Sequence, residues 1–152
     1  MSDTQTLDAI IQALYETVSG PAGAERDTPR MRSLYLPGAH LVRTSVTDDG
    51  RRVANVMDVD GYIKDTADFF RRNGFYEAEI ARRTDLFGNI AQVFSTYEAR
   101  NGPAEAVPFK RGINSIQLFN DGNSWWIVNM LWDNERDDNP MPPEYLPREG
   151  NA

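Results

Sequence analysis

The second half of the chain consists mainly of long segments that predict β-strands. They cover residues 75–87, 90–101, 107–119 and 124–133. Two of the junctions between them, Gly88-Asn89 and Asp121-Gly122, are typical of two-residue hairpin turns. Four long strands with tight turns predict an antiparallel sheet. Such a sheet needs a second layer to cover its apolar face.

The first half of the chain supplies that layer. Residues 7–18 place apolar side chains on one helical face, and Ser19-Gly20-Pro21 ends this helix. Asp27 is expected to cap a short second helix with Pro29 in its first turn. Asp60 is expected to cap a third helix.

The third helix is expected to end at Asn73-Gly74, and a hairpin of residues 39–46 and 51–59 precedes it. Helices followed by long strands predict an α+β fold, with about three N-terminal helices packed on a curved, mainly antiparallel sheet. We expect one domain over residues 1–133. An extended tail rich in Pro and Asp follows over 134–152, held by Tyr145 and Leu146.

Composition excludes several classes of function. The chain has no cysteine, so disulfides, thiolate nucleophiles and cysteine-based metal sites are excluded. The net charge of -7 disfavours a nucleic-acid partner. No phosphate loop or zinc spacing is present, and we expect no cofactor or metal. The polar N-terminus and the lack of long apolar runs predict a cytoplasmic protein without a membrane partner.

The two turns also predict which strand residues pair, and so which side chains share a face. Counted from the first turn, Arg82 lies opposite Ser95; counted from the second, Asn114 lies opposite Asn129. These rungs interrupt the apolar, helix-facing sides of their hairpins. A buried unpaired polar group costs about 1–3 kcal/mol, so each rung needs partners. Either these residues pair within the fold, or they line a pocket and meet a ligand or water.

Around the last turn, the second face is apolar as well. An antiparallel sheet in a two-layer domain usually exposes one polar face to water, so this surface is expected to be covered. We expect a homodimer packed sheet to sheet. The alternative is that the C-terminal tail shields the face. The expected dimer interface consists of Arg111, Ile113, Trp126, Val128, Met130 and Trp132.

Two basic residues are candidates for chemistry. His40 is the only histidine and the first candidate for a general base, although a lone histidine at the start of a strand is more often a surface or rim residue. Arg82 could bind a carboxylate or an oxyanion. The alternative is a structural ion pair with a helix residue such as Glu16 or Asp65.

The strand register decides which face of the sheet the carboxylates of the long strands occupy. Glu77, Glu79 and Glu98 fall on the mixed face, where water would solvate them. A slip of one residue would turn Glu79 and Glu98 inward and make them a candidate acid pair. No other change of register would alter the functional interpretation as much.

The order helix, helix, hairpin, helix and long strands resembles the NTF2-like superfamily, also called cystatin-like or SnoaL-like, with a DUF4440-like branch. Leu34-Tyr35-Leu36-Pro37-Gly38-Ala39 is similar to its passage from helix to first strand, and Gly122-Asn123-Ser124-Trp125-Trp126-Ile127-Val128 to its final strand. The resemblance covers about residues 5–133. It implies a cone-shaped domain with a deep pocket and frequent homodimers. Members include isomerases, dehydratases, cyclases, epoxide hydrolases and non-catalytic binders.

The resemblance also implies roles for single residues. Members that isomerise ketosteroids hold the substrate oxygen with a tyrosine on the first helix, which Tyr15 matches, and an acid on a late strand, near Asn114. Their base corresponds to a position near Arg43, which cannot act as a base at neutral pH. A histidine often present on the final strand corresponds to positions near Asn129 and Leu131. The missing base argues against this isomerisation.

We therefore expect the pocket to bind a small, mostly apolar ligand. One alternative is a cofactor-independent lyase or isomerase, with His40, Tyr15 and Asn114 as catalytic candidates. Another is a protein-interaction domain. The expected ligand-binding residues are Tyr15, Tyr35, Met57, Arg82, Ser95, Tyr97, Asn114 and Asn129.

Overall fold

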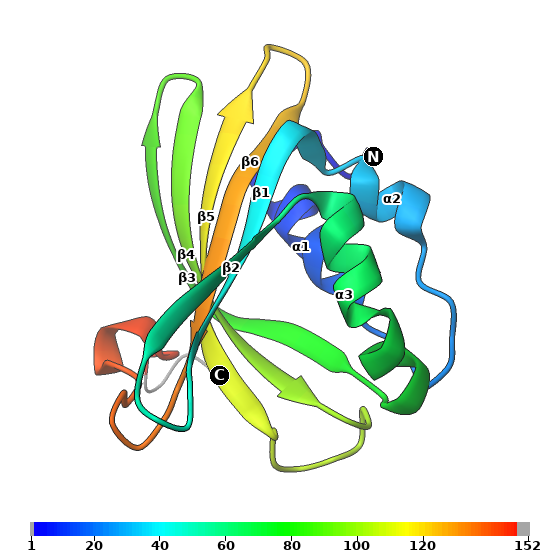
Figure 1. Ribbon diagram of the computed structural model, residues 1–152. Coiled ribbons are helices and arrows are strands. Elements are labelled where there is room, and N and C mark those ends of the chain that lie inside the picture. Colours follow the sequence, from blue (N-terminus) through cyan, green and yellow to red (C-terminus); the bar gives the residue numbers. More distant parts are fainter. Residues whose placement is uncertain (1, 149–152) are drawn as a thin grey trace.

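The computed structural model describes residues 2–148. Within them, three helices lie on one face of a six-stranded sheet of order β2-β1-β6-β5-β4-β3 (Figure 1). Neighbouring strands are antiparallel, except that β1 and β6 run parallel. The elements are α1 (Leu7–Val18), α2 (Thr28–Arg32), β1 (Tyr35–Val46), β2 (Arg52–Met57), α3 (Val59–Arg72), β3 (Tyr76–Phe87), β4 (Ile90–Arg100), β5 (Lys110–Asn120), β6 (Trp125–Asn134) and the 3-10 turn η1 (Pro143–Tyr145). The α+β architecture is confirmed, with α2 only five residues long.

The helices begin where side chains accept hydrogen bonds from free backbone N–H groups. Thr6 caps α1 by accepting from the Ala9 N–H, and Asp27 caps α2 as predicted. The prediction for α3 was wrong by two residues. Its cap is Asp58, whose carboxylate accepts from the Gly61 N–H at 2.7 Å, and Asp60 lies inside the helix.

The register of the β3–β4 hairpin was predicted correctly near its turn and wrongly beyond it. Arg82 lies opposite Ser95 as expected. A β-bulge between Glu79 and Ala81 then shifts the pairing, so that Glu79 lies opposite Tyr97 in place of the expected Ile80. Because successive strand residues point to opposite faces, one extra residue turns Glu77 and Glu79 inward, towards the helices.

The register of the β5–β6 hairpin was wrong from the turn onwards. The loop has four residues, because the Asp121 carboxylate accepts hydrogen bonds from the Asn123 and Ser124 N–H groups, both at 2.8 Å. A further irregularity follows, and Asn129 then lies opposite Gln117. The expected Asn114–Asn129 rung is therefore not formed.

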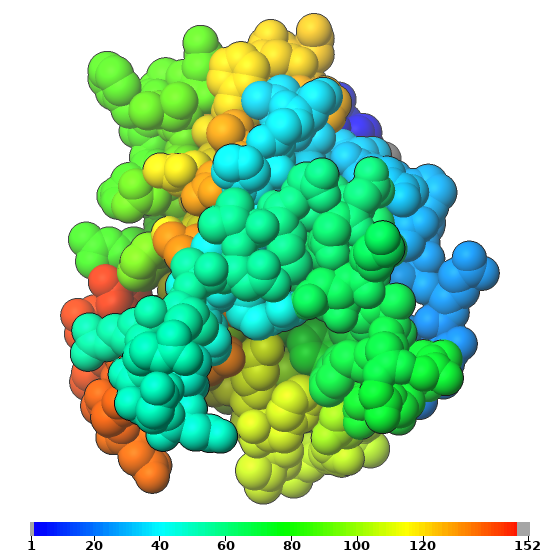
Figure 2. Space-filling view, viewed as in Figure 1, coloured from blue at the N-terminus to red at the C-terminus, as the bar shows by residue number. Residues whose placement is uncertain are grey.

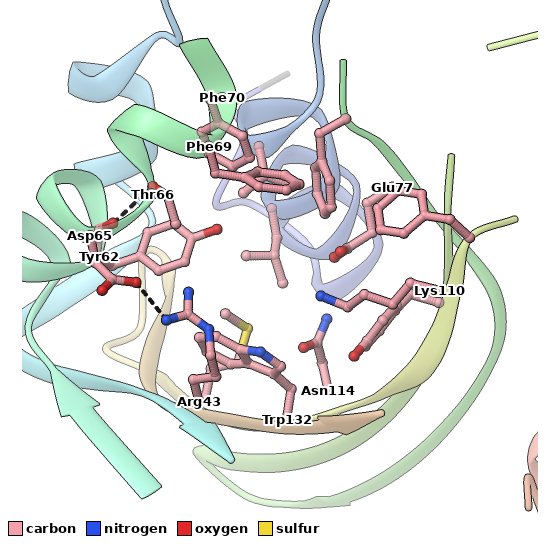
Figure 3. A pocket seen from close by; sticks show the side chains of 16 residues that line it. Arg43, Tyr62, Asp65, Thr66, Phe69, Phe70, Glu77, Lys110, Asn114 and Trp132 are labelled. Carbon is pink, nitrogen blue, oxygen red and sulfur yellow. Dashed lines mark hydrogen bonds and ion pairs between the residues drawn. The ribbon is translucent and has the colours of Figure 1, made fainter. Parts of the chain in front are cut away.

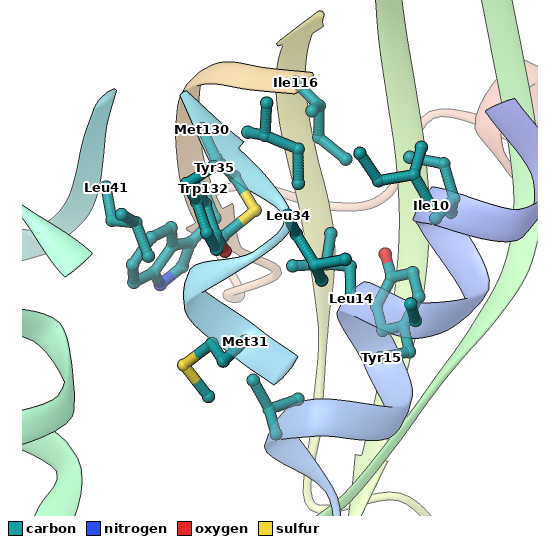
Figure 4. Close-up of a cluster of buried hydrophobic side chains, with 14 of the residues drawn as sticks. Ile10, Leu14, Tyr15, Met31, Leu34, Tyr35, Leu41, Ile116, Met130 and Trp132 are labelled. Carbon is teal, nitrogen blue, oxygen red and sulfur yellow. The ribbon is translucent and has the colours of Figure 1, made fainter. Parts of the chain in front are cut away.

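This shift also moves two expected interface residues into the interior. Met130 and Trp132 are 6% and 7% exposed, respectively, and lie on the helix side of the sheet. Their neighbours in the core include Leu34, Leu41 and Ile116 (Figure 4). The outer face keeps Ile113, Trp126 and Leu131 among its apolar residues.

The C-terminal segment covers part of that outer face. Thr96 donates a hydrogen bond to the Tyr145 carbonyl at 2.6 Å, and the Tyr145 ring lies 5.4 Å from the ring of Phe94. Arg111, expected in a dimer interface, pairs with Glu135 at 2.9 Å. The rest of the expected tail, residues 149–152, lies outside the described residues. No helix within residues 2–148 is long and apolar enough to cross a membrane.

Strand curvature opens a space between the two layers. The ends of β3, β4 and β5 next to the 101–109 loop bend beneath α3 (Figure 1). At the other end the layers meet in a continuous apolar core, whose fully buried members include Ile10, Leu34 and Ile116. Tyr35 and Met57, expected to bind ligand, belong to this core.

Candidate functional site

A cavity of about 410 Å³ lies between α1, α3 and the curved end of the sheet. In Figure 2 the recess is bordered by α3, in green, and the yellow-green segment before β5. Two edge-on aromatic contacts build its wall, Phe75 with Phe109 at 6.1 Å and Tyr62 with Trp132 at 6.1 Å. The apolar lining consists of Leu14, Val18, Phe69, Phe70, Phe75, Phe109, Met130 and Trp132.

Two carboxylates line this cavity, Asp65, which pairs with Arg43, and Glu77, which lies beside Lys110 and Asn114 (Figure 3). Its backbone is fixed to the end of α1, because the Glu77 N–H donates to the Ser19 hydroxyl at 3.0 Å. Burial raises the pKa of Glu77 to about 7, and the charge of Lys110 and the amide of Asn114 offset this only in part. Glu77 therefore carries a proton near neutral pH and can also release it.

Lys110 approaches Glu77 from β5 without forming an ion pair with it in the described structure. Its Nζ atom lies 5.8 Å from the ring centre of Phe75 and 5.7 Å from that of Tyr97. Burial lowers the pKa of Lys110, while the charge of Glu77 opposes that shift. Within residues 2–148 the ammonium group has no hydrogen-bond acceptor, so its donors are available to a ligand.

The third polar side of the cavity comes from α3. The Tyr62 hydroxyl points into the cavity and has no hydrogen-bond partner among the described residues (Figure 3). Beside it, Arg43 donates to Asp65 at 2.5 Å and stacks over the Trp132 ring at 5.7 Å. No fully buried side-chain N or O atom in residues 2–148 lacks a partner. Unpaired atoms such as the Tyr62 hydroxyl and Lys110 Nζ therefore open onto the cavity.

A second polar cluster lies next to the cavity and is already saturated. The Tyr15 hydroxyl lies 2.6 Å from the Ser95 hydroxyl, and Asn114 donates to Tyr15 at 3.1 Å. Ser95 in turn donates to Glu79. Because Ser95 uses its only proton there, Tyr15 must donate to Ser95.

This cluster continues to the surface through an arginine. Arg82 pairs with Glu79 at 2.8 Å and with Asp8 on α1 at 2.5 Å. The structural ion pair that was the alternative interpretation of Arg82 is present, with Asp8 in place of Glu16 or Asp65. In the described structure the Tyr15 hydroxyl gives its proton to Ser95 and accepts from Asn114, so it is not directed at the cavity.

The predicted ligand-binding residues are thus divided among several places. Tyr97 and Asn114 line the cavity; Tyr15 and Ser95 form the buried part of the saturated cluster, and Arg82 its outer part. The Tyr97 hydroxyl is held at 2.6 Å by Asn134, and Gly112 opposite it leaves no room for a side chain.

Two other predicted residues lie on the opposite face of the sheet. Asn129 pairs with Gln117 on the outer side, and His40 is exposed beside it. The reason is the pairing of β1 with β6, which puts His40 opposite Asn129 and turns both away from the helices. Neither side chain lines the cavity.

Sequence reasoning assigned no pocket role to Glu77 or Lys110. The available signal for Glu77 was the sensitivity to register, since a shift of one residue turns strand carboxylates inward. Lys110 gave no signal beyond its place near the start of a strand. Within residues 2–148, no group of three or more His, Cys, Asp or Glu side chains could hold a metal ion.

No protein-family model matches the chain, and no curated protein matches it significantly. Solved structures do. An NTF2-like protein of unknown function from Pseudomonas putida is 10% identical, with 90% of each chain covered and a TM-score of 0.62. A candidate dehydratase of the NTF2-like family from Streptomyces avermitilis is 12% identical, covering 88% of this chain and 96% of its own, with a TM-score of 0.60.

A third similar structure is the yeast UBP3-associated protein BRE5. It is 14% identical, covers 86% of this chain and 94% of its own, and has a TM-score of 0.60. At these identities, the similarity establishes the fold and nothing more specific. The chain therefore has the NTF2-like, or cystatin-like, fold that its order of helices and strands implied.

Proposed function

We propose that the cavity binds a small, mostly apolar molecule with one polar end. Its volume, about 410 Å³, falls within the ~300–1,000 Å³ of typical ligand pockets. Aromatic and aliphatic side chains make most of the wall, and the polar groups Glu77, Lys110 and Asn114 lie together on one side, with Tyr62 across the cavity from them (Figure 3). A group of polar side chains on one side of a mostly apolar cavity suits a ligand with a single polar group.

A specific observation also favours a second candidate, a cofactor-independent lyase or isomerase. It is the position of Glu77, an acid with a pKa of about 7 inside an apolar cavity. A group that titrates near the working pH serves best as a general acid or base. Glu77 also borders the groove between α1 and β3, which gives it a path for proton exchange with water.

In this reaction Glu77 would remove a proton from a carbon next to a carbonyl and return it elsewhere. Lys110 and Tyr62 would donate hydrogen bonds to the oxygen as negative charge develops on it. The similar structure described as a candidate dehydratase supports this class of chemistry on the fold without identifying the substrate.

The test separates binding from chemistry. A thermal-shift screen of small aromatic and aliphatic ketones, acids and alcohols should give hits that stabilise the wild type. Lys110→Met should weaken those hits, whereas Lys64→Met, on the exposed side of α3, should not. No hit in such a screen would count against the binding proposal.

Hits that carry a carbonyl are then incubated in D₂O and followed by proton NMR. Loss of the signal next to the carbonyl in the wild type, and its retention in Glu77→Gln, would support proton transfer. Binding without hydrogen exchange would show that the cavity binds the ligand but does not catalyse proton transfer.

We also propose a homodimer packed through the part of the outer face that the tail leaves uncovered. Ile113, Trp126 and Leu131 support it, Leu131 being 38% exposed. Sedimentation should show a dimer at micromolar concentration that Leu131→Glu dissociates. Phe87→Glu, at the exposed tip of the β3–β4 hairpin, is the control that should leave it intact. A wild-type monomer would contradict the proposal.

A further inference from the structure

Only two of the chain's 16 lysine and arginine residues are lysines, Lys64 and Lys110. Lys64 lies on the exposed side of α3, whereas Lys110 lines the cavity. Arginine is the usual choice for a permanent ion pair, and it keeps its charge in any protein environment. Lysine can lose its proton when it is buried, and its neutral amine is then a nucleophile.

No carboxylate or other acceptor within residues 2–148 holds Lys110 in its charged form. Its Nζ atom faces the rings of Phe75 and Tyr97, at 5.8 and 5.7 Å, and within residues 2–148 it has neither an ion pair nor a hydrogen bond. The ion pairs of the described chain are all made by arginines, including Arg43, which lines the same cavity, and Arg111, the next residue on β5. Burial, which lowers the pKa of Lys110, acts in the same direction.

The partner that imine chemistry needs is also in the cavity. Figure 3 shows the carboxyl group of Glu77 and the amine of Lys110 directed to the same space. Glu77 on β3 and Lys110 on β5 both pair with Ala99 on β4, one from each side, so the fold brings together an acid and an amine that are 33 positions apart in the chain.

We propose that Lys110 forms a covalent imine with an aldehyde or ketone bound in the cavity. The inference rests on the proposed function, because it needs a ligand in the same space. It goes further by assigning the ligand a chemical class, an apolar molecule whose polar end is a carbonyl group. It also assigns Lys110 the role of a nucleophile in place of a simple hydrogen-bond donor.

The step balances without any other reactant. The lone pair of neutral Lys110 attacks the carbonyl carbon, a C–N bond forms, and a proton moves from nitrogen to oxygen to give a carbinolamine. Protonated Glu77 then gives its proton to the hydroxyl group, which leaves as water. The products are a protonated iminium on Lys110 and a carboxylate on Glu77, so an ion pair replaces two neutral groups.

The experiment traps that iminium by reduction. The protein is incubated at pH 7 with benzaldehyde and sodium cyanoborohydride, and the benzylated amine is located by peptide mass spectrometry. Besides the N-terminus only two amines can react, so the assignment is direct. We expect Lys110 to be labelled several-fold faster than Lys64. Labelling of Lys110 should be lost in Lys110→Arg and unchanged in Lys64→Arg. Glu77→Gln should slow it several-fold.

Benzyl alcohol separates failure of this inference from failure of the proposed function. It has the same shape but cannot form an imine, and its binding is followed by ligand-observed NMR. If it binds the wild type and Lys110 is labelled no faster than Lys64, the imine is overturned and the binding pocket stands. If it does not bind and Lys110 is not labelled, both fail. Retained binding of the alcohol by Lys110→Arg would show that lost labelling does not reflect a collapsed cavity.

Discussion

Two polar clusters lie side by side on the inner face of the sheet, and they differ in how completely their hydrogen bonds are satisfied. In the closed cluster, Tyr15, Ser95, Glu79 and Arg82 hold one another from the cavity wall to the surface. In the open cluster, Glu77, Lys110 and Tyr62 face a cavity of about 410 Å³. Asn114 touches both, since it donates to Tyr15 and also lines the cavity.

Comparing Glu77 with Glu79 shows how a candidate functional carboxylate differs from a structural one in this fold. The two are the same residue type, two positions apart, and turned inward by the same bulge. Glu79 receives hydrogen bonds from Ser95 and Arg82, so its charge is compensated within the fold. Glu77 meets an apolar cavity with a lysine that does not reach it. A buried acid without full compensation is a better candidate for chemistry than one inside a complete network.

The largest effect is expected in the pH dependence of stability, which tests Glu77 in the open cluster. The pKa of Glu77 is raised from 4.5 to about 7, so between these values the folded state binds a proton that the unfolded state has released. Stability should therefore fall as pH rises through this window, by at most about 3 kcal/mol for this group. Glu77→Gln should remove that fall.

The measurement is urea unfolding of both proteins from pH 4 to pH 8, compared as a difference. Lys110 on β5, Arg43 on β1, Asp65 and Tyr62 on α3 and Tyr97 on β4 also face the cavity, but they are present in both proteins. A difference in unfolding free energy that does not change with pH would mean that Glu77 has an ordinary pKa.

A matched pair of tyrosine variants compares the two clusters directly. Tyr15→Phe removes a hydroxyl with two partners and leaves Asn114 and Ser95 short of one each. It should cost about 1–3 kcal/mol of unfolding free energy. Tyr62→Phe removes a hydroxyl that only faces the cavity and should cost less than about 0.5 kcal/mol. Equal losses of unfolding free energy for the two variants, measured by chemical denaturation, would show that the clusters do not differ in how far their hydrogen bonds are satisfied.

An effect smaller than that of Tyr15→Phe is expected at the surface end of the closed cluster. Asp8 is 91% exposed in its pair with Arg82, so water screens the interaction. Asp8→Asn should lower stability by less than about 1 kcal/mol, because Glu79 continues to compensate Arg82. A larger loss in the same unfolding assay would mean that the network depends on its exposed end.

Much of this fold could be predicted from local signals. Helix 7–18, the Asp27 cap and the Gly88-Asn89 turn follow from residue patterns that act within a few positions. The Arg82–Ser95 rung, close to that turn, was also predicted correctly. Such features do not depend on distant parts of the chain.

The candidate site could be predicted only in part, because it depends on two irregularities. The bulge before Ala81 and the irregularity between Leu118 and Gln117 in the β5–β6 pairing each shift a register by one residue. Both depend on tertiary packing and leave only weak signals in the sequence. Each reverses the face of the sheet to which the residues beyond it point. For this reason Glu77 was expected in water, and Trp132 was expected on the outer face.

The most direct test of the contrast between the clusters is the titration of Glu77 itself. Carbon-13 NMR of glutamate carboxyl groups, recorded from pH 3 to pH 9 and assigned by the signal lost in Glu77→Gln, gives its pKa. The contrast predicts a midpoint of about 7, shifted by a ligand that fills the cavity. A midpoint near the ordinary value of 4.5 would show that Glu77 is solvated or fully compensated, and would contradict the open cluster as the functional site.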